Sequence, residues 1–208
     1  MMQSLFSNIR FYILIFSIVL SFVEYAWVWR SFETTGERIT VIVPLYAYTA
    51  LVYLYVALLA GPLTKLFIWF PLRASYVKAR RAIGVSAFYF GLLHAKFAFF
   101  DFLGGFPGLF TLNSTYLNAL VLSSSALLIL SLMAATSFDY MVKALTFAKW
   151  KMLHRFVYIA SLFILIHAIL IGTRFQEFFL IRLLLGTGTV LLVGLHLVGL
   201  KRKYQQKL

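Results

Sequence analysis

The sequence predicts an all-α integral membrane protein, a single bundle of six transmembrane helices. The 208 residues are 62% hydrophobic and only 12% charged, and the mean hydropathy is +0.92. One soluble core cannot bury so many apolar side chains, so lipid must solvate most of them. The apolar residues form continuous stretches rather than alternating with a period of two, which favours helices over a transmembrane barrel.

Six apolar stretches are long enough to cross a membrane, within one domain that covers residues 1–208. They run over 11–29, 39–60, 82–103, 115–135, 152–172 and 180–200. The first stretch continues past Glu24 to Arg30 without a small-x-small cleavage site, which predicts a retained span rather than a secretory signal. Segment 62–79 mixes aromatic and basic residues with two prolines, so we expect it to lie along the membrane interface. GGFPG at 104–108 predicts a turn.

The basic residues predict the orientation of the bundle. Most of them lie in the N-terminus, the 61–81 and 136–151 loops and the tail: Arg10, Lys65, Arg73, Lys78, Arg80, Arg81, Lys143, Lys149, Lys151, Lys201, Arg202, Lys203 and Lys207. The opposite loops hold only Arg30, Arg38, Arg174 and Arg182. The positive-inside rule therefore predicts a multi-pass membrane protein with both termini in the cytoplasm. In a bacterium, this corresponds to the inner (plasma) membrane. Lipid headgroups account for the net charge of +13 better than nucleic acid does.

The histidines carry the strongest functional signal. Cysteine is absent, which excludes disulfides, iron–sulfur clusters, covalent haem attachment and thiol catalysis. All four histidines fall inside predicted spans, where ionisable side chains are costly and usually functional. At 1.5 Å per residue they sort by depth into an outer pair, His94 and His167, and an inner pair, His154 and His196. Facing imidazoles at one depth are the usual axial ligands of a b-type haem.

Each histidine also has a simpler interpretation. His94 and His167 could be buried side chains that only form hydrogen bonds, and His154 could reach the lipid headgroups. His196 could bond a backbone carbonyl or solvent. In addition, His154 and His167 lie 13 residues apart, which turns them by about 220° around a straight helix. Two haems at two depths could still approach the helix from different sides, or a bulge could realign the two histidines.

Two segments resemble a known superfamily. RRAIGVSAFYFGLLH (80–94) and TSFDYMVKALTFAKWKMLHRFVYIASLFILIH (136–167) resemble the ferric reductase-like transmembrane domain, and the layout is most similar to the MsrQ group of haem-binding membrane subunits. The likeness is strongest over 45–170. It implies haem b bound by His94 and His167, with His154 in a second, inner haem site. Two-haem members carry a further histidine about 14 residues before the outer one, and here that position is Arg80. We therefore assign His196 as the second ligand of the inner haem, because its predicted depth matches that of His154.

Several charged residues are candidates for supporting roles. Glu24 and Lys96 both lie in the outer half of their helices and are expected to pair with each other. Alternatively, Lys96, Arg174 or Arg182 contacts haem propionates. Three basic residues near the inner face have three possible roles. They contact haem propionates, bind an anionic electron donor, or only set the membrane orientation; the residues are Arg80, Arg81 and Arg155.

The expected function is that of a membrane cytochrome b, the haem-binding electron-transfer subunit of an oxidoreductase. The chain contains neither a Walker A sequence nor a GxGxxG fingerprint, so electrons would enter from quinol or a cytoplasmic flavin reductase, with FMN or quinone as further cofactors. The resemblance implies a periplasmic molybdopterin reductase of methionine sulfoxide, the MsrP type, as the acceptor. A standalone ferric or quinone reductase is the first alternative. The second is a small transporter in which the histidines relay protons and no chromophore is bound.

Overall fold

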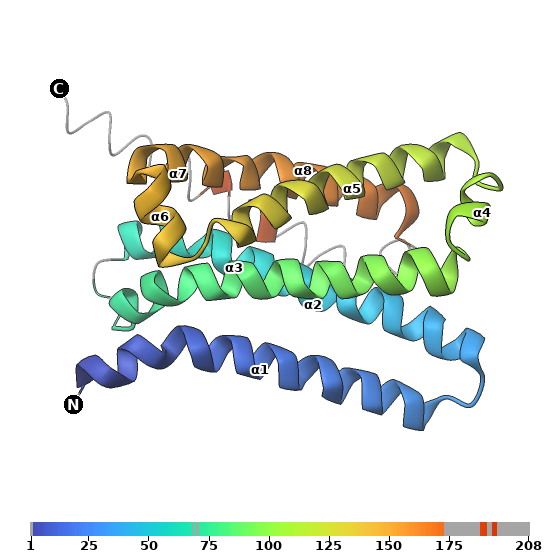
Figure 1. Ribbon diagram of the computed structural model, residues 1–208, viewed down its shortest axis with the longest axis horizontal. Helices are drawn as coiled ribbons and strands as arrows, with labels where there is room; N and C mark the ends of the chain where they lie inside the picture. The colour runs from blue at the N-terminus through green and yellow to red at the C-terminus, as the bar shows by residue number, and fades with distance from the viewer. Residues whose placement is uncertain (1, 68, 70, 173–187, 191–192, 195–208) are drawn as a thin grey trace.

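The computed structural model describes residues 2–67, 69, 71–172, 188–190 and 193–194 (Figure 1). The described part is all-helical and contains no strand, which confirms the predicted all-α class. Five of its helices are long and apolar enough to cross a membrane, as expected for a multi-pass membrane protein. The sixth expected span, 180–200, lies largely outside the described residues.

The candidate spans match the first five predicted stretches, and each begins earlier than predicted, the third by the most. The first three are α1 (Met2–Ser31), α2 (Thr35–Leu66), and α3 (Arg73–Lys96) with its π-helical continuation η1 (Phe97–Phe102). The fourth is α5 (Ser114–Ala135), and the fifth joins α7 (Phe147–Leu153), the 3-10 turn η2 (His154–Phe156) and α8 (Val157–Ile171). Two short helices, α4 (Phe106–Leu109) and α6 (Asp139–Leu145), lie in the connections.

Local sequence signals explain where the helices begin. Thr34 and Glu37 form a capping box at the start of α2, and the Asn113 side chain accepts the backbone N–H of Tyr116 at the start of α5. The predicted turn at 104–108 is present. Gly104 and Gly105 adopt positive φ angles of 78° and 75°, which side chains with a Cβ rarely tolerate.

Segment 62–79 does not form an element of its own. Residues up to Leu66 complete α2, and α3 begins at Arg73. Pro62 is accommodated inside α2, one turn before its end. The two candidate spans end at Thr64 and begin at Arg73, so the exposed Trp69 belongs to the connection between them, and a place along the interface stays a prediction for that connection.

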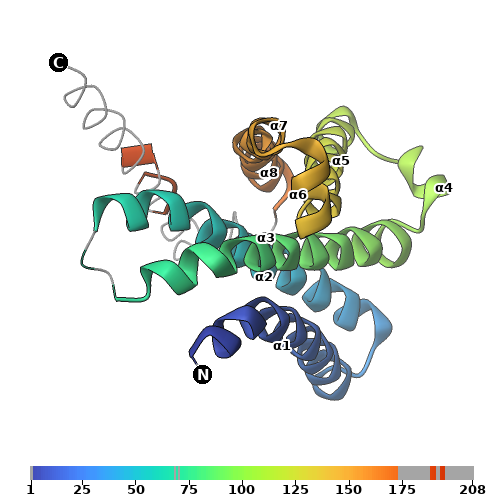
Figure 2. The ribbon, with the colours of Figure 1, turned by 60° about the vertical axis from the view of Figure 1, so that its left-hand side comes forward.

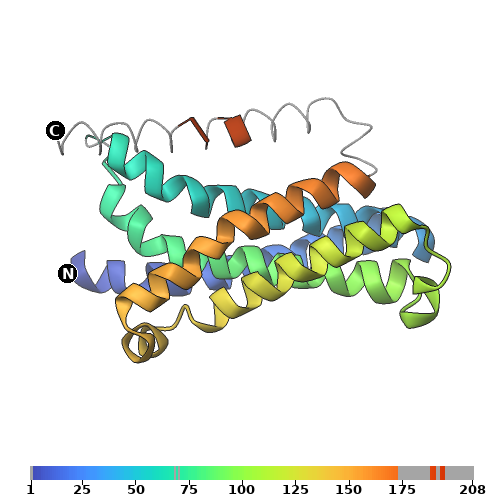
Figure 3. The same cartoon turned by 90° about the horizontal axis from the view of Figure 1, so that it is seen from above.

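The helices form three layers around the α2–α3 pair. The α2 and α3 helices have the most extensive mutual contact, α1 packs on one side of them, and α5 with α8 forms a second close pair (Figures 1 and 2). Contacts between α3 and α5 join the two pairs. Seen from above, α8 runs at a shallow angle to α5, on the side nearer α2 (Figure 3). The two pairs, α2–α3 and α5–α8, enclose the interior in which the candidate site lies.

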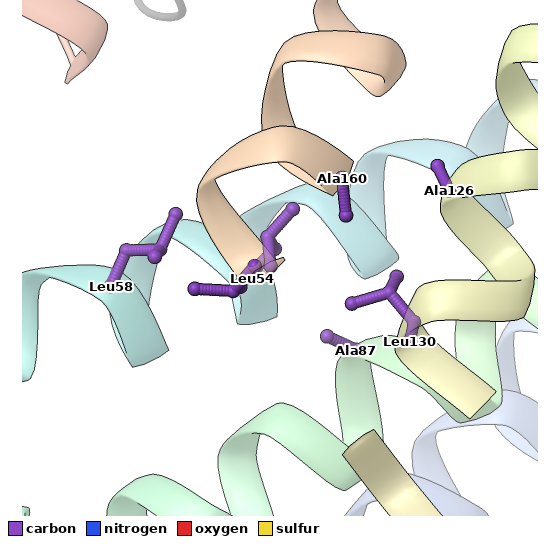
Figure 4. Close-up of a cluster of buried hydrophobic side chains, with 7 residues drawn as sticks. Leu54, Leu58, Ala87, Ala126, Leu130 and Ala160 are labelled. Atoms are coloured by element: carbon purple, nitrogen blue, oxygen red, sulfur yellow. The ribbon is translucent and has the colours of Figure 1, made fainter. Parts of the chain in front are cut away.

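A small-residue core closes this interior near its middle. It comprises Leu54, Leu58, Ala87, Ala126, Leu130, Val157 and Ala160, contributed by α2, α3, α5 and α8 (Figure 4). The three alanines are at most 1% exposed. Their short side chains let the helix backbones approach closely, which is how helices associate in lipid.

Hydroxyl groups dock α1 onto the α2–α3 pair. The Ser17 hydroxyl lies 2.9 Å from the Tyr53 hydroxyl of α2 and 2.7 Å from that of Ser86 on α3. One turn further along α1, Ser21 and the Tyr89 hydroxyl are 2.8 Å apart. These contacts satisfy polar groups that lipid would leave without partners.

The charged residues are distributed asymmetrically between the two ends of the bundle. One end of the bundle contains the start of α1, the α2–α3 connection, α6 and α7, and we call it the basic end. Its described basic residues are Arg10, Arg73, Lys78, Arg80, Arg81, Lys143, Lys149, Lys151 and Arg155. Asp139 of α6 is the one described acidic residue there, and it bridges Arg10 of α1 (3.2 Å) and Arg81 of α3 (2.6 Å). The bridge ties three elements together.

The bridge predicts a pH-dependent contribution to stability. The Arg81 hydrogen bond and the positive charges of Arg81 and Arg10 lower the pKa of the Asp139 carboxyl. The stabilisation is therefore complete above the unfolded-state pKa of about 4 and is lost as the pH falls through the lowered value. Because Asp139 is exposed, we expect Asp139→Asn to cost about 1 kcal/mol or less at pH 7. Thermal unfolding in detergent from pH 7 to 3 measures this. The difference between the variant and wild type should shrink on acidification, whereas the exposed control Glu33→Gln should change little at any pH.

Candidate functional site

The two outer histidines meet in the interior of the bundle. The His94 ring of α3 and the His167 ring of α8 have centroids 6.3 Å apart and planes at 81°. Both residues are half-buried. His94 lies eight residues before the end of its candidate span, and His167 lies four residues before the end of its own. The pair therefore sits nearer the end opposite the basic end, as the sequence predicts.

Backbone carbonyls of neighbouring helices fix both imidazole rings. The Nδ1 atom of His94 lies 2.9 Å from the Val43 carbonyl oxygen on α2, and Nδ1 of His167 lies 2.9 Å from the Ala119 carbonyl oxygen on α5. A carbonyl oxygen can only accept, so each Nδ1 carries the proton and each Nε2 presents a lone pair. Among the described residues, neither Nε2 atom has a hydrogen-bond partner.

The spacing of the rings fits two ligands on opposite sides of one metal ion. With an imidazole nitrogen about 2.0–2.1 Å from a metal and roughly 1.1 Å from its own ring centre, two such rings have centroids about 6.4 Å apart. The observed 6.3 Å agrees with this value. The described residues contain no cluster of three or more His, Asp or Glu side chains that could complete a metal site alone. A haem requires only two protein ligands, because its porphyrin supplies the other four.

The small-residue core positions the histidines. Ala87 and Ala160 lie seven residues before His94 and His167 respectively, and Ala126 lies seven residues after Ala119. Seven residues make almost two turns, so each alanine shares a helix face with its partner, about 10 Å closer to the basic end. The close packing at the alanines therefore lies on the basic-end side of the imidazoles and brings together the helix faces that carry them.

A small apolar gap lies between α2 and α8. It is lined by Leu51, Leu54, Tyr55, Ser161, Ile164, Leu165 and Ala168, and neither His94 nor His167 is part of the lining. The α2 and α8 helices are not among the closely packed pairs, unlike α2 with α3 and α5 with α8.

His154 occupies a different environment at the basic end. It begins the η2 turn between α7 and α8, so the helix carrying His154 and His167 is interrupted between them. The Trp150 ring packs on His154 at 4.1 Å, and Trp150 Nε1 donates to the Thr136 carbonyl oxygen at 3.0 Å. The nearest polar contact of its Nε2 is the Thr136 hydroxyl at 3.4 Å. Within the described part of the chain, no other histidine ring contacts His154.

Arg80 and Arg81 of α3 lie within electrostatic range of His154. The proposed partner, His196, and the propionate candidates Arg174 and Arg182 lie outside the described residues.

The expected Glu24–Lys96 pair is wrong. Lys96 Nζ binds Asp101 at 2.8 Å and lies 3.8 Å from the centre of the Phe97 ring. The Glu24 carboxylate instead accepts the Thr49 hydroxyl of α2 at 2.7 Å. The π-helical stretch η1 explains the change, because its wider turns bring residues five apart into contact.

Two parts of the site escaped the sequence analysis. The carbonyl acceptors at Val43 and Ala119 have no sequence signal, since every residue carries a carbonyl group. Trp150, by contrast, lies four residues before His154, and this i, i+4 spacing could have indicated the ring contact.

Comparison with known proteins provides no further assignment. No protein-family model matches the chain, and no curated protein or solved structure matches it significantly.

Proposed function

We propose that the protein is a membrane b-type cytochrome that passes electrons from the side of the basic end to an acceptor on the opposite side. The observation that carries the proposal is the His94–His167 pair, whose rings are spaced for a single metal ion and whose Nε2 atoms have no partner among the described residues. Neither Nε2 atom is among the fully covered atoms that lack a partner in the described residues, so both lone pairs remain open to a ligand.

In this proposal, haem b binds between His94 and His167. When bound, it supplies a one-electron couple that the polypeptide lacks. The chain's own residues hold and orient the iron. The Val43 and Ala119 carbonyls fix the tautomer of each imidazole, and such contacts strengthen histidine as a metal ligand.

The positive-inside rule places the basic end in the cytoplasm, and the inner membrane is the corresponding location. The imidazole pair then lies toward the periplasm, which suits delivery to a periplasmic acceptor. By the resemblance described above, that acceptor is a molybdopterin reductase of the MsrP type, and the donor is quinol or a cytoplasmic flavin reductase. His154, with Arg80 opposite, belongs to the side on which the electrons enter.

Loss of either imidazole should remove the haem. We expect His94→Ala and His167→Ala each to lower the haem content below about a tenth of wild type, since one remaining ligand leaves the iron with an open position. The measurement is a reduced-minus-oxidised visible spectrum of detergent-purified protein with haem quantified per chain. Leu92→Ala and Leu162→Ala, exposed positions on the same two helices, are matched controls that should keep wild-type haem. A colourless wild-type protein that takes up no haem on reconstitution would contradict the proposal.

Exchange of one ligand should change the potential rather than abolish binding. In His167→Met the thioether can still coordinate iron, and His/Met ligation raises the reduction potential relative to a pair of histidines. A redox titration followed in the visible spectrum measures the shift. If the variant kept both the wild-type potential and the wild-type spectrum, His167 would not be a ligand.

A further inference from the structure

Glu24 is an acidic residue in the apolar interior of the bundle. It lies on α1, seven residues or about 10 Å before the helix ends at Ser31, and its candidate span contains no other acidic residue. Its Oε1 atom accepts the Thr49 hydroxyl. Its Oε2 atom is fully covered and is the one buried side-chain oxygen or nitrogen in the described residues without a hydrogen-bond partner.

Among the described residues, the groups around Glu24 supply no compensating positive charge. Tyr46 of α2 lies within electrostatic range of Glu24, and also of Tyr25 on α1 and Tyr89 on α3. A phenol group carries no positive charge. The charged groups of the neighbouring α3–η1 segment, Lys96 and Asp101, bind each other. A carboxylate here would have one hydrogen bond and no ion pair, and an isolated buried charge is far costlier than a neutral acid.

We propose that Glu24 is a proton-binding site inside the membrane, whose carboxyl group is protonated at neutral pH and releases its proton when the charge at the His94–His167 site increases. The second part rests on the proposed function. If a haem held there were oxidised, one electron would pass to the outer acceptor and the bundle would gain one positive charge. The O–H bond of Glu24 would then break, its electron pair would stay on the carboxylate oxygen, and the proton would pass to water.

The shared helix α2 couples the two groups. Thr49, the donor to Glu24, lies six residues from Val43, whose carbonyl holds His94, a separation of about 9 Å along the axis. Between them Tyr46 packs against Phe90, which is one turn before His94 on α3. No mobile ions enter this packed interior, so the charges interact with little screening.

Infrared spectroscopy tests the protonation directly and does not depend on haem. We expect the wild type at pH 7 to show the C=O stretch of a protonated carboxyl group, which Glu24→Gln lacks, and the band to persist at pH 9. Because an amide has the shape of the neutral acid, Glu24→Gln should unfold within a few degrees of wild type. Asp139→Asn and Glu33→Gln, which alter exposed acids, should not remove the band. Identical spectra for wild type and Glu24→Gln at pH 7 would overturn the proposal.

A second measurement tests the coupling. In haem-loaded protein, the reduced-minus-oxidised infrared difference spectrum should contain the Glu24 C=O band, and this feature should be missing in Glu24→Gln. The midpoint potential should vary with pH less in that variant than in wild type. A difference spectrum without a Glu24 band would refute the proposed proton release on oxidation. It would not affect the proposal that Glu24 is protonated at neutral pH. Failure to bind haem would refute the proposed function and leave the first measurement unaffected.

Discussion

Lipid offers no hydrogen-bond partners, and this constraint determines how the helices of this protein associate. Polar side chains within the spans must find partners on other helices or on their own backbone. Ser17 therefore meets Tyr53 and Ser86, and the two imidazoles meet carbonyls of α2 and α5. Each such contact fixes the rotation of one helix against the next. The polar groups thus specify the arrangement, while the apolar surface secures only the membrane location.

The same contacts fix the orientation of the two imidazole rings before any ligand is bound. Each ring is held at Nδ1, and the helix faces that carry the rings are brought together by Ala87, Ala126 and Ala160. A site prepared in this way loses little conformational entropy when it takes up a ligand. The distance between the rings is therefore a property of the packing two turns away, so substitutions that enlarge these alanines should disturb the site without contacting it.

The ends of the bundle differ in their electrostatics. At the basic end, one carboxylate joins two arginines in contact with water, where such pairs contribute modestly. Glu24, in contrast, has no cation beside it and one covered oxygen. Identical chemical groups thus have opposite expected charge states, because one faces solvent and guanidinium groups while the other faces phenols and hydrocarbon.

The sequence by itself determined the helical class, the five described spans to within several residues, the charge asymmetry and the depths of the histidines. These properties depend on composition and on residue spacing along one helix, which are local. Sequence reasoning failed where contacts between residues determine the outcome. Segment 62–79 is divided between two long helices and their connection, and Lys96 pairs with Asp101 rather than Glu24.

Only the tertiary structure decided which groups face each other. The rotation of each helix about its axis determines several features of the site. These are the approach of His94 to His167, the carbonyls that orient the two rings, the break at η2 and the covered oxygen of Glu24. That rotation is set by close contacts between alanines and hydroxyl groups of different helices. A one-dimensional pattern does not encode such contacts, because any face with small residues could in principle pack against any other.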